Sequence, residues 1–227
     1  MLLVIWDVDG TLVDAAGAGH RALVRAVATV VGHPVNLDGL DYAGRTDRAL
    51  IEESLARSGG RPASDWPLVR EEYTRLLQEE LSVAAGRALP GAQAILEAVA
   101  GDRLMRQVLG TGNLEAGAWI KLGHYGLAHY FATGGFGDTH RTRPPILREA
   151  VANAIRHYES RFDHLVIVGD TPRDADAAEA LGAPCLLVAT GRYPTTTLKE
   201  YGPHVLPDLT DTEQVLAFFH DVTRGRT

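Results

Sequence analysis

Runs of apolar residues that end in polar residues or glycine set the pattern of this chain. Leu2–Trp6 is a continuous apolar run followed directly by Asp7, which predicts a strand buried on both faces. Three further runs predict strands of the same kind, and a fourth segment indicates a shorter extended piece. These segments are Met105–Leu109, His164–Val168, Pro184–Val188 and, for the short piece, Tyr130–Gly134.

A second periodicity, with apolar residues at helical spacing, predicts the helices between those runs. After Asp14 it extends from Ala22 to Val31, and Asp14 is a candidate helix cap. Further helices are expected up to Ala100 and at 114–122, 145–158 and 174–181. Strands that alternate with helices predict a parallel sheet covered on both faces, which is a doubly wound α/β fold.

The region from about residue 16 to residue 84 breaks this alternation, because no strand pattern interrupts its helical one. Leu50, Ile51 and Leu55, for example, recur at the spacing of one helix face. We therefore expect a Rossmann-like core formed by residues 1–15 and 85–227, with a mostly helical domain inserted at 16–84.

Composition limits the classes of protein to which the chain can belong. Of its 227 residues, 45% are apolar and 22% are charged, the balance of an ordinary globular protein. A net charge of -7 without any cluster of lysine or arginine argues against a nucleic-acid-binding surface. The single cysteine, Cys185, leaves no internal disulfide and fits a reducing compartment.

The apolar runs are short. None approaches the roughly 20 residues that a membrane-spanning helix needs. The chain enters Leu2–Trp6 directly, without a basic segment followed by a longer apolar one and a cleavage site. We therefore expect a cytoplasmic protein that binds neither membrane nor nucleic acid.

Polar residues follow three of the predicted strands directly. These residues are Asp7-Val8-Asp9-Gly10-Thr11, Thr111-Gly112-Asn113 and Asp170-Thr171-Pro172-Arg173-Asp174. Because ligands bind beyond the carboxyl ends of parallel strands, we expect all three groups to converge on one crevice. Each aspartate taken alone could be a turn residue or a helix cap. The order in which one sheet supplies the three groups favours a joint site.

The carboxylates of these groups suit a hard metal ion. Asp7 and Asp9 lie two positions apart on an extended strand end, so their side chains project to the same side. Gly10 lets the backbone turn sharply away after them. Joined by Asp170, they would form an oxygen-rich site that suits Mg²⁺, which binds one or two carboxylates and keeps room for a phosphate oxygen. The charge of the ion would let the carboxylates lie close together.

With these motifs the chain resembles the phosphatases of the haloacid dehalogenase superfamily, and within it the phosphoglycolate phosphatase branch. Asp7-Val8-Asp9-Gly10-Thr11-Leu12-Val13-Asp14 is similar to the family's first motif, Thr111-Gly112-Asn113 to its second, and Gly169-Asp170-Thr171-Pro172-Arg173-Asp174 to its fourth. The likeness spans nearly the whole chain. It implies that residues 16–84 form a helical cap and that the protein is a Mg²⁺-dependent phosphatase of small phosphomonoesters.

The resemblance also implies a role for each residue of the motifs. Asp7 would attack phosphorus and form an aspartyl-phosphate. Asp9 would protonate the leaving alcohol and then take a proton from the attacking water. The side chains of Asp7 and Asp170 and the backbone carbonyl of Asp9 would hold Mg²⁺. Phosphoryl oxygens would be bound by the second motif, through Thr111, Gly112 and Asn113.

The third motif departs from the commonest pattern of the family, in which a Lys-Pro pair begins the helix before the fourth motif. Arg143-Pro144 occupies the corresponding place here, and the arginine fork suits phosphate oxygens. Lys121 is a rival cation, because helical side chains lean toward the N-terminus of their helix and so toward the site. A subgroup of the family combines a Thr-Gly-Asn motif with a Lys-Leu pair like Lys121-Leu122. Both cations stay candidates, and either could instead be a solvated surface residue.

Two further residues each allow two interpretations. Asp174 is expected to support the metal site from behind its ligands, although it could also cap the helix that follows. Arg45 lies in Gly44-Arg45-Thr46-Asp47, which resembles the cap segment that closes over the substrate. Arg45 could therefore contact the leaving group, or the segment could be a helix start capped by Thr46 or Asp47.

The acidic residue at position 9 narrows the expected chemistry. Dehalogenases and phosphonatases that the chain resembles lack an acidic residue at the position of Asp9, so phosphate esters are the favoured substrates. A sugar phosphomutase of the same fold retains it and is the nearer alternative. A non-enzymatic phospho-acceptor like a receiver domain is more distant, because its acceptor lies on a middle strand of a shorter chain. The expected partner is a small phosphorylated metabolite, and the expected assembly is a monomer or a homodimer.

Overall fold

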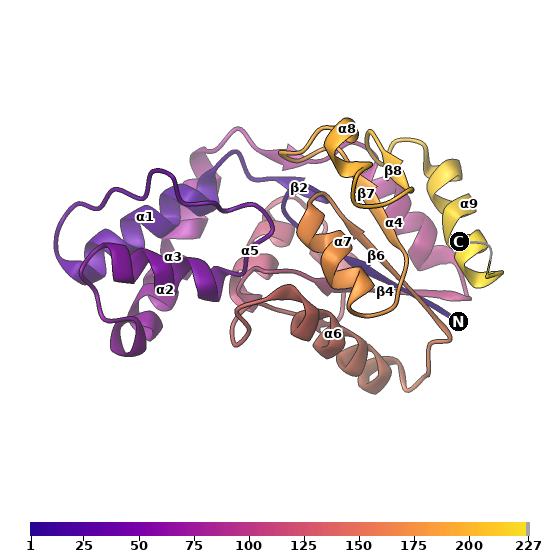
Figure 1. The fold of residues 1–227 in the computed structure, drawn as a ribbon, viewed down its shortest axis with the longest axis horizontal. Helices are drawn as coiled ribbons and strands as arrows, with labels where there is room; N and C mark the ends of the chain where they lie inside the picture. The colour runs from indigo at the N-terminus through magenta and orange to yellow at the C-terminus, as the bar shows by residue number, and fades with distance from the viewer. Residues whose placement is uncertain (226–227) are drawn as a thin grey trace.

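A parallel sheet of six strands forms the centre of the computed structural model, which describes residues 1–225 (Figure 1). Its strand order is β5-β4-β1-β6-β7-β8. The strands are β1 (Leu2–Trp6), β4 (Met105–Gly110), β5 (Gly134–Gly135), β6 (His164–Gly169), β7 (Cys185–Val188) and β8 (Val205–Leu206). All neighbours in this sheet pair in parallel. The expected α/β, doubly wound fold is therefore confirmed.

Helices cover both faces of the sheet, as its continuous apolar strands require. Leu2, Val4 and Trp6 of β1 pack on one side with α4 and α9, whereas Leu3 and Ile5 pack on the other with α6 and α7. The helices of the core are α4 (Ala92–Gly101), α5 (Glu115–His124), α6 (Arg143–Tyr158), α7 (Pro172–Glu179), α8 (Thr195–Leu198) and α9 (Thr212–Thr223). A 3-10 turn, η1 (Ala128–Tyr130), follows α5.

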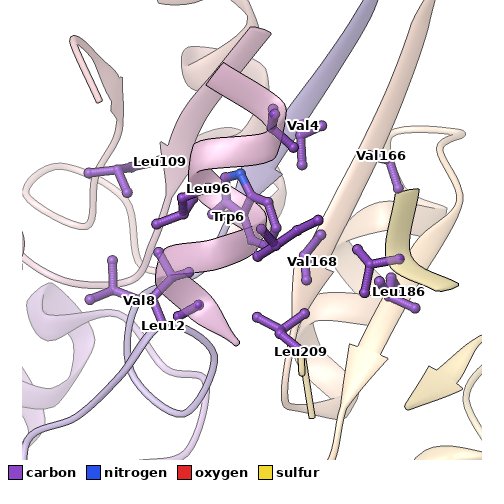
Figure 2. Packing of buried hydrophobic residues seen from close by; sticks show 14 of the residues in the cluster. Val4, Trp6, Val8, Leu12, Leu96, Leu109, Val166, Val168, Leu186 and Leu209 are labelled. Carbon is purple, nitrogen blue, oxygen red and sulfur yellow. The ribbon is translucent and has the colours of Figure 1, made fainter. Parts of the chain in front are cut away.

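Trp6, the last residue of β1, anchors the larger cluster of the core. Its side chain is fully buried, and its ring meets that of Phe219 in α9 edge to face at 6.1 Å. Figure 2 shows it among Leu96 of α4 and Val168 of β6. Trp6 is followed at once by Asp7, so this packing also fixes the strand end that leads into the first motif.

Three helices form a separate group, which we call the helical unit: α1 (Ala18–Val31), α2 (Asp47–Arg57) and α3 (Pro62–Val83). They have a hydrophobic cluster of their own, in which Val27, Leu55 and Leu77 are buried together. In Figure 1 the unit stands beyond one end of the sheet. A short antiparallel ribbon, β2 (Val13–Asp14) with β3 (Arg87–Ala88), joins it to the core. No helix in the described part of the chain is long and apolar enough to cross a membrane.

Two local expectations were wrong. Asp14 does not cap α1, because the helix begins at Ala18, directly after Gly17, which is its N-cap in a left-handed conformation. The Asp14 carboxylate accepts the N–H of Ala16 at 2.8 Å instead. The extended piece expected at Tyr130–Gly134 begins too early, because Tyr130 ends a 3-10 turn and the strand is Gly134–Gly135. Two glycines show no apolar pattern, so the position of β5 comes from its pairing with β4 and its packing on α6.

The packing of β5 on α6 gives a test of this architecture. A Cβ on Gly135 would collide with the backbone carbonyl of Ile146 and lie 2.9 Å from the backbone nitrogen of Ala150. We expect Gly135→Ala to lower the free energy of unfolding by about 1–3 kcal/mol, as overpacked cores do. The matched control is Gly123→Ala in α5, where no atom lies within 4 Å of the added Cβ. Equal urea midpoints for both variants and the wild type would contradict this packing.

Candidate active site

The three motifs meet at a cavity between the carboxyl ends of the strands and the helical unit. Its volume is about 510 Å³. From the core it is lined by Asp7, Asp9, Thr111, Gly112, Asn113, Lys121, Arg143 and Asp170, and from the helical unit by residues that include Arg45. The tenth predicted site residue, Asp174, is fully buried behind Asp170 and contacts Arg143. The structure thus brings all ten together.

Asp7 is held at the end of β1 by the core alone. Its N–H donates to the carbonyl of Val168 at 2.9 Å, which continues the pairing of β1 with β6. Its carboxylate lies 3.1 Å from Nη2 of Arg143, the first residue of α6. Burial raises the pKa of Asp7 to about 6; Arg143 opposes this rise, and Asp174 adds to it. The strand end therefore presents one buried carboxylate to the cavity, paired with one cation.

Arg143 joins two carboxylates and a strand end. Its Nη2 lies 2.6 Å from Asp174 and 3.1 Å from Asp7, and it donates to the carbonyl of Gly110 at 3.1 Å. The N-terminus of a helix disfavours a cation, so the dipole of α6 cannot be what holds this side chain. Burial opposes the charge of Arg143, but Asp174 and Asp7 outweigh it and raise its pKa above the usual value. Arg143 is therefore a structural counter-ion of the acidic cluster.

Three carboxylates lie close enough to share one ion. Oxygen atoms of Asp7, Asp170 and Asp174 all lie within 4.8 Å of one another. Burial, together with the charges of Asp174 and Asp7, raises the pKa of Asp170 well above its usual range. Oδ1 of Asp170 is buried and has no hydrogen-bond partner among the described residues. An orphaned carboxylate oxygen beside two others fits a hard divalent cation such as Mg²⁺.

Glycines make room for Asp170. A Cβ on Gly10, which has a φ of +77°, or on Gly191 would collide with its carboxylate. No sequence motif marks Gly191, but its backbone lies against the Asp170 carboxylate and so belongs to the site. Thr190 and Gly191 follow the end of β7, and the Thr190 hydroxyl donates to the carbonyl of Gly10 at 2.5 Å. The Thr190-Gly191 pair, which begins two residues after the strand, was the signal that could have revealed this fourth strand end.

The side chain of Asp9 does not join the three clustered carboxylates but forms a second polar cluster with Lys121 and Asn113. Its carboxylate lies 2.5 Å from Nζ of Lys121 and accepts a hydrogen bond from Nδ2 of Asn113 at 2.8 Å. Lys121 also donates to Oδ1 of Asn113 at 2.5 Å. Lys121 is buried, which disfavours its charge, but Asp9 and Asp47 raise its pKa above the usual value. The Asp9 side chain is 45% exposed and so remains accessible from the cavity.

The hydroxyl of Thr111 is prepared to donate. It accepts hydrogen bonds from the backbone N–H of Asn113 at 3.3 Å and from Nδ2 of the same residue at 2.8 Å. With both bonds directed at its oxygen, its own proton is left for another acceptor. Thr111 and Gly112 line the cavity, so a phosphoryl oxygen bound there could take that proton.

The structure shows which contacts Asp174 and Arg45 make, the two residues for which the sequence allows two interpretations. One carboxylate oxygen of Asp174 accepts both the N–H and the hydroxyl of Thr171, at 3.0 and 2.7 Å, and the other meets Arg143. Asp174 thus caps α7 and also belongs to the acidic cluster. Arg45 lines the cavity, but its guanidinium pairs with Glu53 at 2.7 Å. Thr46 is the N-cap of α2, since its side chain accepts the N–H of Ala49.

Comparison with known proteins agrees with this geometry. A family model for HAD-hydrolase-like proteins matches residues 144–212. The chain is 29% identical to the phosphoglycolate phosphatase of Agrobacterium fabrum, over 91% of this chain and 88% of that one. It is 27% identical to the phosphoglycolate phosphatase of Rhodobacter capsulatus, over 83% and 84% of the two chains.

Solved structures show the same fold. CbbY of Rhodobacter sphaeroides, crystallised with phosphate, superposes with a TM-score of 0.70 at 18% identity, over 92% of this chain and 95% of that one. A hydrolase of Pseudomonas syringae gives a TM-score of 0.70 at 20% identity, over 96% and 99%. With the converging motifs, these likenesses show that the chain is similar to phosphoglycolate phosphatases and, over residues 144–212, to HAD-hydrolase-like proteins, and they support a phosphatase.

Proposed function

We propose that the protein hydrolyses small phosphomonoesters with Mg²⁺ through an aspartyl-phosphate on Asp7. The observation that carries the proposal is the pairing of two carboxylates with two different cations on one cavity. Asp7 is paired with Arg143, and Asp9 is paired with Lys121. A buried carboxylate beside an accessible one provides a nucleophile and a proton carrier for the same phosphorus atom.

In the first step an oxygen of Asp7 attacks phosphorus. A bond forms between that oxygen and phosphorus, and the ester P–O bond breaks with its electron pair going to the leaving oxygen. Asp9 gives its proton to that oxygen, so the product leaves as a neutral alcohol. The core hydrogen bonds and the ion pair with Arg143 hold Asp7 in place before substrate arrives, which lowers the cost of orienting the nucleophile.

In the second step water replaces Asp7 on phosphorus. Asp9, now ionised, takes a proton from the water as its oxygen bonds to phosphorus, and the bond from phosphorus to Asp7 breaks. Inorganic phosphate leaves, and both aspartates return to their starting states. Throughout, the Thr111 hydroxyl and the N–H group of Gly112 would donate to the phosphoryl oxygens, while Asn113 orients Thr111.

Mg²⁺ fits the acidic cluster and would be held by the carboxylates of Asp7 and Asp170 and by the backbone carbonyl of Asp9. When bound, the ion supplies positive charge that neutralises the phosphoryl group and the carboxylates around it. Asp174 stays behind these ligands, where it fixes Arg143 and the N-terminus of α7.

The helical unit is, in this proposal, the cap over the cavity. It contributes His20, Tyr42, Arg45 and Asp47 to the cavity wall. A cavity of about 510 Å³ suits a small metabolite rather than a folded phosphoprotein. Phosphoglycolate is the first substrate to test, since two relatives of similar length carry the name phosphoglycolate phosphatase.

Replacement of the nucleophile tests the central step. Asp7→Asn removes the attacking oxyanion, and we expect phosphate release from small phosphomonoesters to fall by at least about a thousandfold. The matched control is Asp176→Asn on the exposed surface of α7, which should keep wild-type turnover. Colorimetric phosphate assays over a panel of sugar and acid phosphates measure both. Full turnover by Asp7→Asn would disprove the mechanism, and an isomerised sugar phosphate in place of free phosphate would indicate a mutase.

Removal of the metal tests the cofactor. Treatment with EDTA should abolish phosphate release, and added Mg²⁺ should restore it. Asp170→Asn weakens the acidic cluster, so we expect it to need about tenfold to a hundredfold more Mg²⁺ for half-maximal rate. Asp176→Asn again serves as the control. A metal-free enzyme that keeps its rate would show that the acidic cluster holds no catalytic ion.

Replacing Lys121 and replacing Arg143 should change in different ways how the hydrolysis rate depends on the leaving group. Lys121 contacts the proton carrier Asp9, so Lys121→Met should slow hydrolysis of alkyl phosphates much more than hydrolysis of p-nitrophenyl phosphate, whose leaving group departs without protonation. Arg143 contacts the nucleophile Asp7, so Arg143→Lys should slow both by a similar factor. Steady-state rates on the two substrates decide the matter. The assignment fails if both variants show the same ratio between substrates as the wild type.

A further inference from the structure

The helical unit touches the core on the loop of the second motif, which is the proposed phosphate-binding loop. The backbone N–H of Asp47 donates to the carbonyl of Gly112 at 2.7 Å. A Cβ on Gly112 would collide with the carbonyl of Arg45 and lie 3.1 Å from Cα of Thr46. Gly112 is therefore needed for this close approach, and the segment 45–47 is docked directly on the loop.

The side chain of Asp47 makes a second bond to the same loop. Its Oδ2 accepts the N–H of Leu114 at 2.8 Å, and Leu114 is the N-cap residue directly before α5. The first N–H groups of a helix lack partners within it, and the helix dipole favours a negative charge there. Asp47 thus caps α5 from another part of the fold, 67 residues away in sequence.

Asp47 is not needed for its own helix. Thr46 caps α2 through its side chain, which leaves the Asp47 carboxylate to reach across to the core. Burial raises the pKa of Asp47 to about 6, although Lys121 and the N–H of Leu114 oppose the rise. At pH 8, above this pKa, the carboxylate is ionised and its burial lowers the free energy of unfolding. The protein regains that free energy only as the pH falls below about 6. The charged and titratable groups that face it are Lys121 of α5, Asp9, Asp138 and Tyr73 of α3.

We propose that Asp47 is a positioning residue that shapes the phosphate-binding loop when the helical unit closes over the cavity. Its two bonds hold the loop at Gly112 and Leu114, on either side of Asn113. Asn113 in turn orients Thr111, Asp9 and Lys121. The contacts that stabilise the transition state are thereby completed only when the cap is docked. This inference rests on the proposed function, because it assigns the loop to phosphate.

Another contact from α2 provides a matched control. Glu52 accepts hydrogen bonds from Arg141 of the core at 2.6 and 3.0 Å, and from Arg48 of its own helix at 2.5 Å. This ion pair also joins the helical unit to the core, but it does not touch residues 111–114. Because the Arg141 side chain is 68% exposed, this ion pair contributes little to docking, so Glu52→Gln leaves the docked state in place. Asp47→Ala instead removes the bond to the loop.

Steady-state kinetics on p-nitrophenyl phosphate with Mg²⁺ at pH 8 test the inference. We expect Asp47→Ala to lower kcat by about tenfold to a hundredfold, the effect of losing one charge-assisted hydrogen bond. KM should change less than about threefold, because the lost contact belongs to the transition state. Asp47→Asn keeps an oxygen that can accept from Leu114 and should return kcat to within about fivefold of wild type. Glu52→Gln should stay within about twofold.

Two results would overturn the inference: a kcat for Asp47→Ala within about twofold of wild type, or an equal loss for Glu52→Gln. A spectroscopic readout covers the case in which Asp47→Ala does not fold. The amide proton of Leu114 should move upfield in Asp47→Asn relative to wild type, because the bond to a carboxylate becomes a weaker one to an amide oxygen. An unmoved resonance would show that the bond does not exist in solution.

Failure of the proposed function is recognisable separately. If the wild type releases no phosphate, or if Asp7→Asn is fully active, the function is wrong while the Leu114 resonance still reports on docking. If the wild type is active, Asp7→Asn is inactive and Asp47→Ala is normal, only the positioning role of Asp47 is wrong.

Discussion

The structure of the site depends on the crowding of acidic side chains at the carboxyl ends of β1 and β6. Asp7, Asp170 and Asp174 lie within 4.8 Å of one another and are buried, an arrangement that is costly without compensating positive charge. Arg143 supplies part of that charge from the first turn of α6, against the preference of the helix dipole. Among the described residues, Oδ1 of Asp170 still has no hydrogen-bond partner, which is why we propose that the cluster holds a cation.

The same crowding dictates where the backbone lacks side chains. Gly10 and Gly191 lie against the carboxylate of Asp170, so the loops after β1 and β7 close tightly around it. This closeness buries the carboxylate, and burial, together with the charges of Asp174 and Asp7, raises the pKa of Asp170 well above its usual range. Loop shape and electrostatics therefore follow from one requirement, that several acidic groups share one small volume.

The sequence predicted those parts of the fold that local patterns determine. The long strands β1, β4 and β6 are mainly apolar, although Arg106 and Gln107 interrupt the run in β4, and the polar residues after them converge as the geometry of a parallel sheet requires. The two-residue strands β5 and β8 escaped prediction because neighbouring strands, not their own side chains, define them. Lys121 and Arg143 could not be ranked, since their partners depend on how α5 and α6 pack. Asp47 was out of reach because its partner lies 67 residues away across a tertiary contact.

The two candidate cations are not alternatives for one position, because Arg143 pairs with Asp7 and Lys121 pairs with Asp9. The Asp7–Arg143 pair is buried and held by the core, so in the proposed mechanism the nucleophile would keep one geometry for any substrate. The side formed by Asp9 and Lys121 is accessible from the cavity and lies next to the helical unit through Asp47. In the proposed mechanism, the leaving group and the closing cap would therefore both contact the half of the site that holds Asp9 and Lys121. Changes in the helical unit could alter the substrate while the attack on phosphorus stays the same, which is how one fold supports many specificities.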